Sequence, residues 1–237
     1  MRLDIYLTET ELASSRSKAA VLIKNGAVRV NGAVVTKSSL DVTDTAVVEI
    51  TKPLRYVGRG GYKLETLVNS CQLRFDGLIC VDIGASTGGF TDCLLQHGAA
   101  KVYAVDVGHG QLDKTLKADT RVISLENTDI RGLLLPQLCD FAVCDLSFIS
   151  LTKVIADIKP LIKTGGRLAA LIKPQFEVGR VKLKHGVLKD ERVITKVVNE
   201  TAAFTEAQGF KRLALIKSAI TGGDGNTEYI SLYENLP

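Results

Sequence analysis

Short apolar runs alternate along most of the chain with stretches in which apolar residues recur every three or four positions. Near-continuous apolar runs are typical of buried parallel strands, and the recurring spacing is typical of helices that bury one face. The predicted strands are residues 79–82, 101–107, 121–125, 141–144, 167–172, 210–218 and 229–233. The predicted helices are residues 62–70, 91–98, 151–161 and 191–209. This order predicts an α/β fold with a largely parallel, Rossmann-like sheet, whose last two strands form an antiparallel edge.

The first fifty residues follow a different pattern. Residues 11–25 have helical spacing. Val28 and Val30 then alternate with polar residues up to Asn31-Gly32, a dipeptide that favours a hairpin turn between two strands. A last short strand is expected at 46–50, which gives a small α+β unit.

These two patterns predict two domains. The small α+β domain is expected at residues 1–51 and the α/β domain at residues 60–237. Residues 52–59 contain a proline and lead into a glycine-rich stretch, so they are interpreted as a linker.

A glycine-rich turn follows the first strand of the larger domain, in the sequence ICVDIGASTGGFT at residues 79–91. Glycine has no side chain, so a ligand can approach the backbone closely, and the free N–H groups of the following helix favour an acceptor-rich partner. The spacing is Gly84-x-x-x-Gly88-Gly89, and Ser86 stands where a dinucleotide-binding loop has its second glycine. The turn therefore predicts a nucleotide-type cofactor and disfavours NAD.

Polar residues recur where the predicted strands end. Asp106 ends the second strand of the larger domain, 17 positions after Gly89, and can accept hydrogen bonds from both hydroxyls of a ribose. Asp145 and Lys173 follow two later strands. Open α/β sheets bind ligands at the carboxyl ends of their strands, so these side chains predict a binding site there. The long basic loop at 175–190 is expected to be either functional or disordered, as loops of this length inside a domain usually are.

Composition and charge narrow the class of protein. The chain has 237 residues, is 46% hydrophobic and carries a net charge of +4. Residues 1–61 hold nine basic and six acidic residues, and this local net charge of +3 suggests a nucleic-acid-binding region. No apolar run is long enough to span a bilayer and the start is charged, so a cytoplasmic location is expected. The five cysteines lack Cys-x-x-Cys spacing and are interpreted as free thiols rather than metal ligands.

The motifs of the small domain occur in a specific order: Arg2-Leu-Asp4, Ser15-Arg16-Ser-Lys18-Ala19, Leu22-Ile23, Gly26, Val28-x-Val30-Asn31-Gly32 and Thr36-Lys37. This order resembles the small RNA-binding domain first described in a ribosomal small-subunit protein, the S4-like domain. The resemblance implies contacts with the phosphates of structured RNA, which position the RNA without reading its sequence. The residues expected to make them are Arg16, Lys18, Lys24 and Arg29, joined by Arg180, Lys182 and Lys184 of the basic loop.

The larger domain carries the motifs GGYKL at residues 60–64, DIGASTGGFTD, CDLSF and LIKPQFE. Together they resemble FtsJ-like, heat-shock-type ribosomal RNA 2'-O-methyltransferases, which use S-adenosylmethionine. With the small domain in front, nearly the whole chain resembles the hemolysin A or TlyA family of two-domain rRNA methyltransferases. By motif, the family's Lys-Asp-Lys-Glu tetrad around the target ribose falls on Lys63, Asp145, Lys173 and Glu228. Glu228 rests on the weaker match GNTEY, and Glu234 is the alternative for its position.

These residue types suit methyl transfer to a ribose 2'-hydroxyl, which is a poor nucleophile and needs a positioned base. Lys173 can be that base when it is uncharged, a form that burial and a nearby Lys63 both favour. Asp145 would then hold Lys173, and Glu228 would orient Lys63. The resemblance places the methionine part of the cofactor against Asp82, Gly84, Ser86, Thr87, Gly88, Gly89 and Phe90, and its ribose against Asp106. Its adenine is expected near Asp129, with Asn127 and Thr128 as the alternatives.

Other classes of protein remain as alternatives. A base N-methyltransferase usually has Asn or Asp followed by Pro-Pro and an aromatic residue, which Asp145-Leu-Ser-Phe does not match. A hemolysin-like membrane-active protein needs an apolar or amphipathic membrane segment, and none is evident in the sequence. A non-catalytic RNA-binding protein would leave the tetrad unused. The expected partners are therefore ribosomal RNA or ribosomal subunits, with no metal and no stable membrane association.

Overall fold

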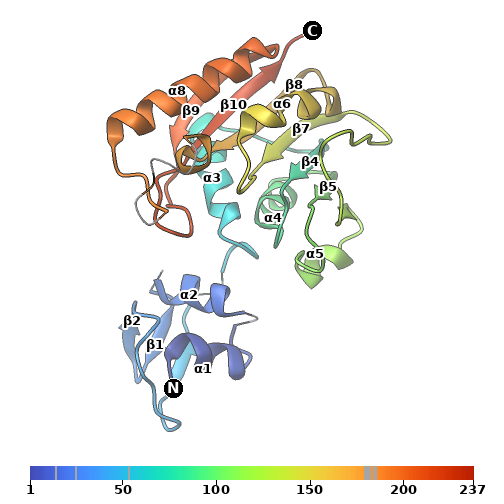
Figure 1. The fold of residues 1–237 in the computed structure, drawn as a ribbon. Coiled ribbons are helices and arrows are strands. Elements are labelled where there is room, and N and C mark those ends of the chain that lie inside the picture. The colour runs from blue at the N-terminus through green and yellow to red at the C-terminus, as the bar shows by residue number, and fades with distance from the viewer. Residues whose placement is uncertain (14, 25, 53, 179–182, 184–185) are drawn as a thin grey trace. The chain divides into compact units, whose positions relative to one another are not determined.

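A computed structural model describes residues 1–13, 15–24, 26–52, 54–178, 183 and 186–237. Contacts between residues divide the chain into two compact units, Met1–Arg59 and Gly60–Pro237 (Figure 1). The first is a small helix-and-strand unit, and the second is an α/β unit built on one large sheet.

The N-terminal unit packs two helices against a three-stranded antiparallel sheet. Its elements are α1 (Leu3–Glu9), α2 (Arg16–Lys24), β1 (Val28–Val30), β2 (Ala33–Val35) and β3 (Val48–Ile50), with the strand order β2-β1-β3. Asn31 and Gly32 have φ angles of +50° and +80°, so the Asn-Gly turn joins β1 and β2 as predicted. Leu3, Leu7 and Ile23 are fully buried in its apolar core.

One prediction for this unit needs correction. The helix expected from residue 11 begins only at Arg16, and a separate helix, α1, precedes it. Glu11 has a φ of +58°, and the main-chain N–H of Ala13 bonds to the carbonyl of Leu7 at 2.7 Å. This turn brings Ala13 into the core beside Leu7, and a continuous helix through Glu11 cannot adopt it.

The larger unit contains a seven-stranded mixed sheet with the order β6-β5-β4-β7-β8-β10-β9. Its strands are β4 (Ile79–Ile83), β5 (Lys101–Val105), β6 (Val122–Leu125), β7 (Cys139–Cys144), β8 (Ile162–Ile172), β9 (Phe210–Lys217) and β10 (Tyr229–Asn235). Strands β6, β5, β4, β7 and β8 are parallel, whereas β10 runs antiparallel to both β8 and β9. The parallel core and the antiparallel edge are both as predicted.

Helices cover both faces of this sheet, as Figure 1 shows. The helical elements are α3 (Gly60–Cys71), α4 (Gly89–Gln96), α5 (Lys114–Ala118), η1 (Leu151–Lys153), α6 (Ile155–Ile158), η2 (Lys159–Leu161), α7 (Pro174–Glu177) and α8 (Glu191–Ala207). Alternate residues of β4, β5, β7 and β8 form one apolar core with η1, α6, η2 and α8. Helices α3 and α4 contact each other, and α4 also contacts β4 and β5. Because parallel strands are buried on both faces, their near-continuous apolar runs follow directly.

Two details of this unit differ from the predictions. The predicted helix at 151–161 is divided into η1, α6 and η2. The strand predicted at 167–172 begins earlier, at Ile162, so β8 continues through Thr164, Gly165 and Gly166. Gly165 has a φ of +77°, and the register with β7 shifts between Cys139 and Phe141, so the irregularity is contained within the strand.

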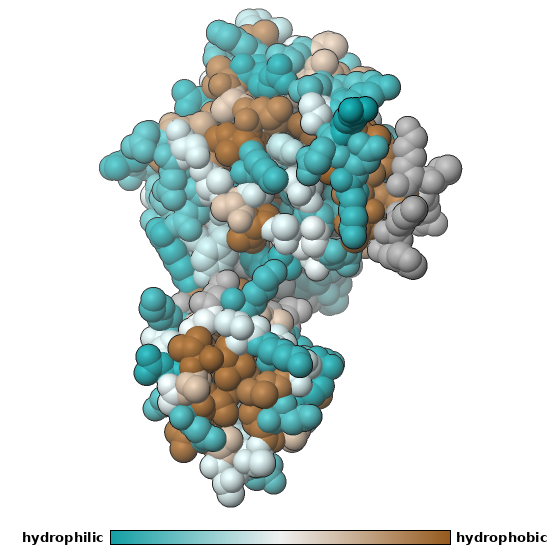
Figure 2. Space-filling view, turned by 90° about the vertical axis from the view of Figure 1, so that its left-hand side faces the viewer, coloured by the Kyte–Doolittle hydropathy of each residue, from teal (hydrophilic) through white to brown (hydrophobic). Residues whose placement is uncertain are grey.

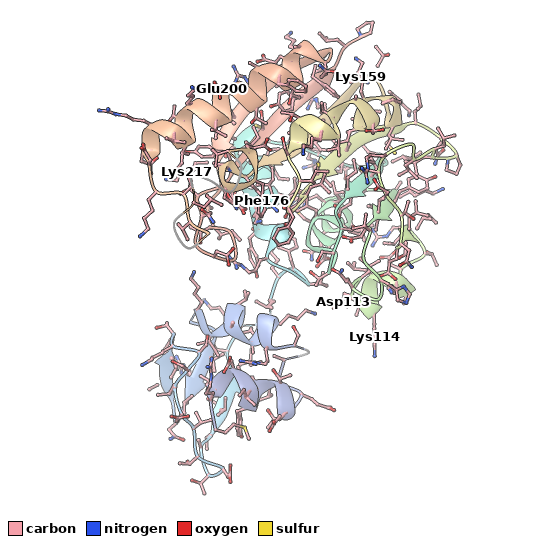
Figure 3. All side chains as sticks on the ribbon, in the orientation of Figure 1. Asp113, Lys114, Lys159, Phe176, Glu200 and Lys217 are labelled. Atoms are coloured by element: carbon pink, nitrogen blue, oxygen red, sulfur yellow. The ribbon has the colours of Figure 1, made fainter. Side chains whose placement is uncertain are left out.

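The far edge of the sheet is fixed to η2 by Lys159, which Figure 3 labels. Its Nζ donates to the carbonyls of Gly209 and Leu236 at 3.0 and 2.8 Å and to Oδ1 of Asn235 at 3.1 Å. Three acceptors from the ends of β9 and β10 therefore surround one ammonium group. These contacts hold the two antiparallel strands to η2.

The surface is mixed in polarity. Figure 2 shows an apolar area on the N-terminal unit, on the side that carries β1 and β2 in Figure 1. Val34 and Val47 of this unit have exposed side chains.

Within the described part of the chain, no helix combines the length and apolar character that a membrane crossing requires. The five cysteines are free thiols, and four of them are buried.

Candidate active site

The four residues of the predicted Lys-Asp-Lys-Glu tetrad lie together at the carboxyl ends of the parallel strands. Asp145 follows β7 and Lys173 follows β8 directly. Strand β10 is antiparallel to β8, and Tyr229 pairs with Ile172, so Glu228 reaches the same edge from the start of β10. Lys63 comes from the first turns of α3. Four residues that are far apart in sequence thus lie together.

The four side chains form an alternating series of charges. Nζ of Lys173 lies 2.5 Å from Oδ1 of Asp145, and Nζ of Lys63 lies 3.4 Å from the other oxygen of that carboxylate. Lys63 is also 2.7 Å from Oε2 of Glu228. With both lysines protonated, the series Lys173, Asp145, Lys63, Glu228 is net neutral, and such pairing stabilises buried charges.

All four side chains are largely withdrawn from water. Their exposed fractions are 7% for Lys173, 17% for Asp145, 9% for Lys63 and 3% for Glu228. A Cβ at Gly222 would lie 2.4 Å from Oε1 of Glu228, so the absence of a side chain at this position lets the carboxylate occupy its place. Low exposure strengthens each interaction because little water screens it.

Two further residues contact Lys173 and were not among the predicted site residues. Oγ of Ser147 accepts a hydrogen bond from Nζ of Lys173 at 3.0 Å. The same Nζ lies 5.8 Å from the centre of the ring of Phe176, which is labelled in Figure 3. Ser147 stands in the motif CDLSF and Phe176 in the motif LIKPQFE. The motifs marked the segments, but the contacts depend on side-chain directions that spacing does not give.

Phe148 stands beside these residues at the surface. Its side chain is 90% exposed, and its ring centre lies 5.2 Å from that of Phe176. Its φ of +66° is unusual for an aromatic residue and is a conformation that surrounding structure must enforce. Glu177 provides part of that support, because it accepts hydrogen bonds from Oγ of Ser150 at 2.5 Å and the N–H of Leu151 at 2.9 Å. The loop after β7 is thus fixed to α7.

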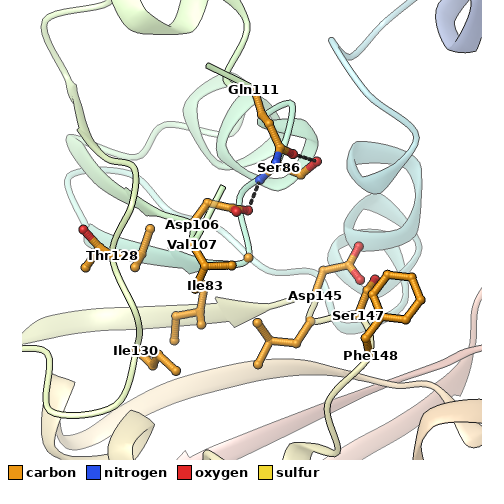
Figure 4. A pocket seen from close by; sticks show the side chains of 13 residues that line it. Ile83, Ser86, Asp106, Val107, Gln111, Thr128, Ile130, Asp145, Ser147 and Phe148 are labelled. Atoms are coloured by element: carbon orange, nitrogen blue, oxygen red, sulfur yellow. Dashed lines mark hydrogen bonds between the residues drawn. The ribbon is translucent and has the colours of Figure 1, made fainter. Parts of the chain in front are cut away.

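A cavity of about 360 Å³ adjoins Asp145, Ser147 and Phe148. Figure 4 shows these side chains on one side of the cavity and Ser86, Asp106 and Gln111 on another. The lining residues are Ile83, Gly84, Ser86, Val105, Asp106, Val107, Gln111, Thr128, Ile130, Asp145, Leu146, Ser147 and Phe148. The size and the mixture of apolar walls with a few polar groups are typical of sites for small ligands.

Asp106 is held in place by main-chain donors. The N–H of Ser86 donates to Oδ2 at 2.7 Å, and the N–H of Gly108 donates to Oδ1 at 2.7 Å. Oγ of Ser86 also donates to Oε1 of Gln111 at 3.1 Å. Each carboxylate oxygen has further acceptor capacity, so Asp106 can receive two hydroxyl groups without losing these contacts.

The glycine-rich turn is built by close backbone approaches. Gly84 has a φ of +82°, and a Cβ there would lie 2.8 Å from the carbonyl oxygen of Asp145. Gly88 has a φ of +92°, and a Cβ there would lie 2.3 Å from a side-chain carbon of Leu116. These two glycines let the turn pack against the loop after β7 and against α5.

Asp82 lies beneath the turn and is completely buried. Its Oδ2 accepts hydrogen bonds from the N–H and Oγ of Thr91, at 2.9 and 2.7 Å, which ties the end of β4 to the first turn of α4. Oδ1 has no hydrogen-bond partner among the residues that the structure describes. Burial raises the pKa of Asp82 to about 7, against the opposing effect of the Thr91 donors.

The predicted cofactor residues divide into two groups. Gly84, Ser86 and Asp106 line the cavity, whereas Asp82, Thr87, Gly88, Gly89 and Phe90 shape the turn without being part of the lining. Asp129 is also outside the lining, between the lining residues Thr128 and Ile130, and its carboxylate is paired with Arg131. That guanidinium holds the pKa of Asp129 at about 2.

Four of the basic residues predicted to bind RNA lie on α2 and β1 of the N-terminal unit. Arg16, Lys24 and Arg29 are exposed, and Lys18 is half-buried. The guanidinium of Arg16 lies 3.1 Å from Oδ2 of Asp4, so part of its charge is used within the unit. Arg180, Lys182 and Lys184 lie outside the described residues. Over the part of the chain that the structure covers, no three His, Cys, Asp or Glu residues are grouped to hold a metal ion.

A largely parallel α/β sheet with a nucleoside-sized cavity beside a buried Lys-Asp-Lys-Glu series is the arrangement of a Rossmann-like methyltransferase. Comparison with known proteins agrees: residues 56–234 match the FtsJ-like methyltransferase family, and residues 1–48 match the S4 domain. The chain belongs to the FtsJ-like methyltransferase family and carries an S4 domain at its N-terminus.

Several relatives align with this chain over nearly its whole length. Hemolysin A from Brachyspira hyodysenteriae is 41% identical over 236 residues, which are 98% of this chain and 98% of that protein. The 16S/23S rRNA (cytidine-2'-O)-methyltransferase TlyA from Mycobacterium tuberculosis is 39% identical over 234 residues, covering 96% of this chain and 87% of that protein. A solved structure of a candidate hemolysin from Streptococcus thermophilus is 37% identical, with a TM-score of 0.79 over 100% of this chain and 88% of that one.

Proposed function

We propose that this protein transfers a methyl group from S-adenosylmethionine to the 2'-hydroxyl of a ribose in ribosomal RNA. The observation that carries the proposal is the buried series Lys173, Asp145, Lys63, Glu228 next to the cavity that Asp106 lines. A cytidine is the preferred target, because relatives at 34% and 39% identity are named as rRNA (cytidine-2'-O)-methyltransferases.

The residues of the cavity fit the cofactor. Asp106 would accept hydrogen bonds from its ribose hydroxyls, since both carboxylate oxygens are fixed and retain acceptor capacity. Val107 and Ile130 offer apolar contacts for the adenine, with Thr128 beside them. The glycine-rich turn would hold the methionine part. That Asp129 contacts the adenine stays a prediction. Its neighbours Thr128 and Ile130 line the cavity and would make that contact if Asp129 does not.

When bound, the cofactor supplies an electrophilic methyl group on a sulfonium. The chain supplies the base: Lys173, as an uncharged amine, takes the proton from the ribose 2'-hydroxyl, so the O–H bond breaks as an N–H bond forms at Nζ. Asp145 fixes that amine and balances the ammonium that results. The positive charge of Lys63 favours negative charge developing on the 2'-oxygen, and Glu228 fixes the position of Lys63.

The RNA would be held by both units. Exposed Arg16, Lys24 and Arg29 suit phosphate contacts, which position an RNA without reading its sequence. The exposed ring of Phe148 suits stacking with an unpaired base near Lys173. Because ribosomal RNA is the substrate, the proposed location is the cytoplasm.

The test is methyl transfer with purified protein. Ribosomal RNA, ribosomal subunits and whole ribosomes from cells that lack this protein are incubated with labelled S-adenosylmethionine, and 2'-O-methylated positions are mapped. Label at a defined cytidine with the wild-type chain, and none with Lys173→Ala, is the expected result. Absence of transfer to all three substrates would overturn the proposal.

Two other functions give different results. A membrane-active protein, which the names of some relatives suggest, would release dye from liposomes without added cofactor. A non-catalytic RNA-binding protein would bind the subunits and leave the RNA unlabelled. The ordered series of buried charges argues against both, because neither function requires it.

A further inference from the structure

We propose that Ser147 is a positioning residue for the base: its hydroxyl fixes the rotation of the Lys173 amine so that the nitrogen lone pair faces the target ribose. This inference rests on the proposed function and assigns a role to a residue outside the Lys-Asp-Lys-Glu series.

The geometry begins with the partners of the Lys173 nitrogen. Oδ1 of Asp145 lies 2.5 Å away and Oγ of Ser147 lies 3.0 Å away. In the described part of the chain these are its two oxygen partners, and the Phe176 ring lies 5.8 Å from the nitrogen. Ser147 and Asp145 both line the cavity, so the amine is held at the cavity wall.

The chemistry of a neutral amine makes the second partner important. An uncharged lysine has two N–H bonds and one lone pair in tetrahedral directions. With Asp145 alone, rotation about the Cε–Nζ bond leaves two directions for the lone pair. A second acceptor, Ser147, uses the other N–H and leaves one direction for the lone pair. The amine is then ready to accept a proton, and the ammonium formed keeps the hydrogen bond to Ser147 and the ion pair with Asp145.

The loop that carries Ser147 is fixed well enough to serve this purpose. Asp145 donates its main-chain N–H to the carbonyl of Ile83 at 3.0 Å, and its carbonyl oxygen packs closely against Gly84. On the other side, Glu177 holds Ser150 and Leu151. The unusual φ of +66° at Phe148, the next residue, is consistent with a loop whose path is imposed by these contacts.

The experiment compares Ser147→Ala, which removes the acceptor, with Ser147→Thr, which keeps a hydroxyl. We expect Ser147→Ala to lower kcat by about tenfold, a part of the effect of general base catalysis, with the KM for RNA and the Kd for S-adenosylmethionine within about twofold of wild type. Ser147→Thr should recover most of the lost rate. In a Lys173→Ala background, Ser147→Ala should have no further effect on the residual rate, because the two residues act as a unit.

The outcomes separate this inference from the proposed function. If the wild-type chain transfers no methyl group, the proposed function fails. If the wild type is active and Ser147→Ala has the wild-type kcat, only the inference fails. Equal losses in the Ala and Thr variants, or a loss confined to cofactor or RNA affinity, would also overturn it. Circular dichroism and thermal melting of both variants establish that they are folded.

Discussion

Lys63 is held between two carboxylates, and the shorter contact is to Glu228: the distance is 2.7 Å to Oε2 of Glu228 and 3.4 Å to Oδ2 of Asp145. Glu228 is the most buried member of the series, with 3% of its side chain exposed. The Lys63–Glu228 pair is therefore both a part of the site and a buried ion pair whose loss affects stability.

Removing Lys63 alone should destabilise the larger unit. Lys63→Met leaves the Glu228 carboxylate buried without its partner, which costs about 3–5 kcal/mol of unfolding free energy. The double variant Lys63→Met/Glu228→Gln removes both charges and should recover most of that stability while remaining inactive. Urea unfolding and the methylation assay measure the two effects. A double variant as unstable as the single one would show that the unpaired Glu228 carboxylate is not the cause of the instability.

The base can be tested through its charge. Lys173→Ala removes the base, and Lys173→Arg replaces it with a guanidinium that does not give up its proton at physiological pH. Both should lower kcat by at least about 100-fold while RNA binding is retained. Lys196→Ala on α8, where the side chain is 72% exposed, is the matched control and should have wild-type activity. An Arg variant with near wild-type kcat would exclude Lys173 as the base.

The residues that sequence reasoning found share a simple property. Asp106, Asp145 and Lys173 directly follow apolar runs, and the carboxyl ends of parallel strands meet at one edge, so periodicity alone brought them together. Glu228 depends instead on the antiparallel pairing of Tyr229 with Ile172, a long-range contact. Its motif indicated the residue, but the spacing did not indicate the pairing.

Other features could not be read from the pattern. The contact of Ser147 with Lys173 depends on a loop conformation and a side-chain direction. Helix α1 is too short for periodicity to mark it, and β8 continues through two glycines that usually interrupt a strand. Arg16 was predicted as an RNA contact from its place in the S4-like motif, yet it also pairs with Asp4, a carboxylate that is 7% exposed, because packing of α1 against α2 brings them together.

Asp82 should make stability depend on pH. Burial raises its pKa to about 7, so between its unfolded value near 4 and pH 7 the folded state holds the proton more tightly than the unfolded state. Stability therefore falls as the pH rises through this window, and the cost is complete above pH 7. Asp82→Asn cannot ionise and keeps an acceptor for Thr91, so it should stabilise the protein more at pH 8 than at pH 5, by roughly 2 kcal/mol.

Urea unfolding at the two pH values measures this difference. Thr91→Val is the informative comparison, because it removes the hydroxyl donor to Asp82 and should destabilise the ionised form further at pH 8. An equal change for Asp82→Asn at both pH values would show that its carboxyl group titrates normally.

Phe148 should matter for RNA and not for folding. Its ring is 90% exposed and contacts Phe176, so Phe148→Ala removes little buried area and should leave the unfolding free energy nearly unchanged. If a base stacks on the ring, kcat/KM for ribosomal substrate should fall about tenfold or more, since stacking on an aromatic side chain is worth about 1–3 kcal/mol per base. Phe148→Tyr keeps a ring of the same shape and should retain most of the activity.

Leu134→Ala, at an equally exposed apolar residue with 87% exposure, is the control and should behave as wild type. Calorimetry with S-adenosylmethionine completes the test: a matching loss of cofactor affinity in Phe148→Ala would assign the ring to the cofactor cavity, which it also lines, instead of to the RNA.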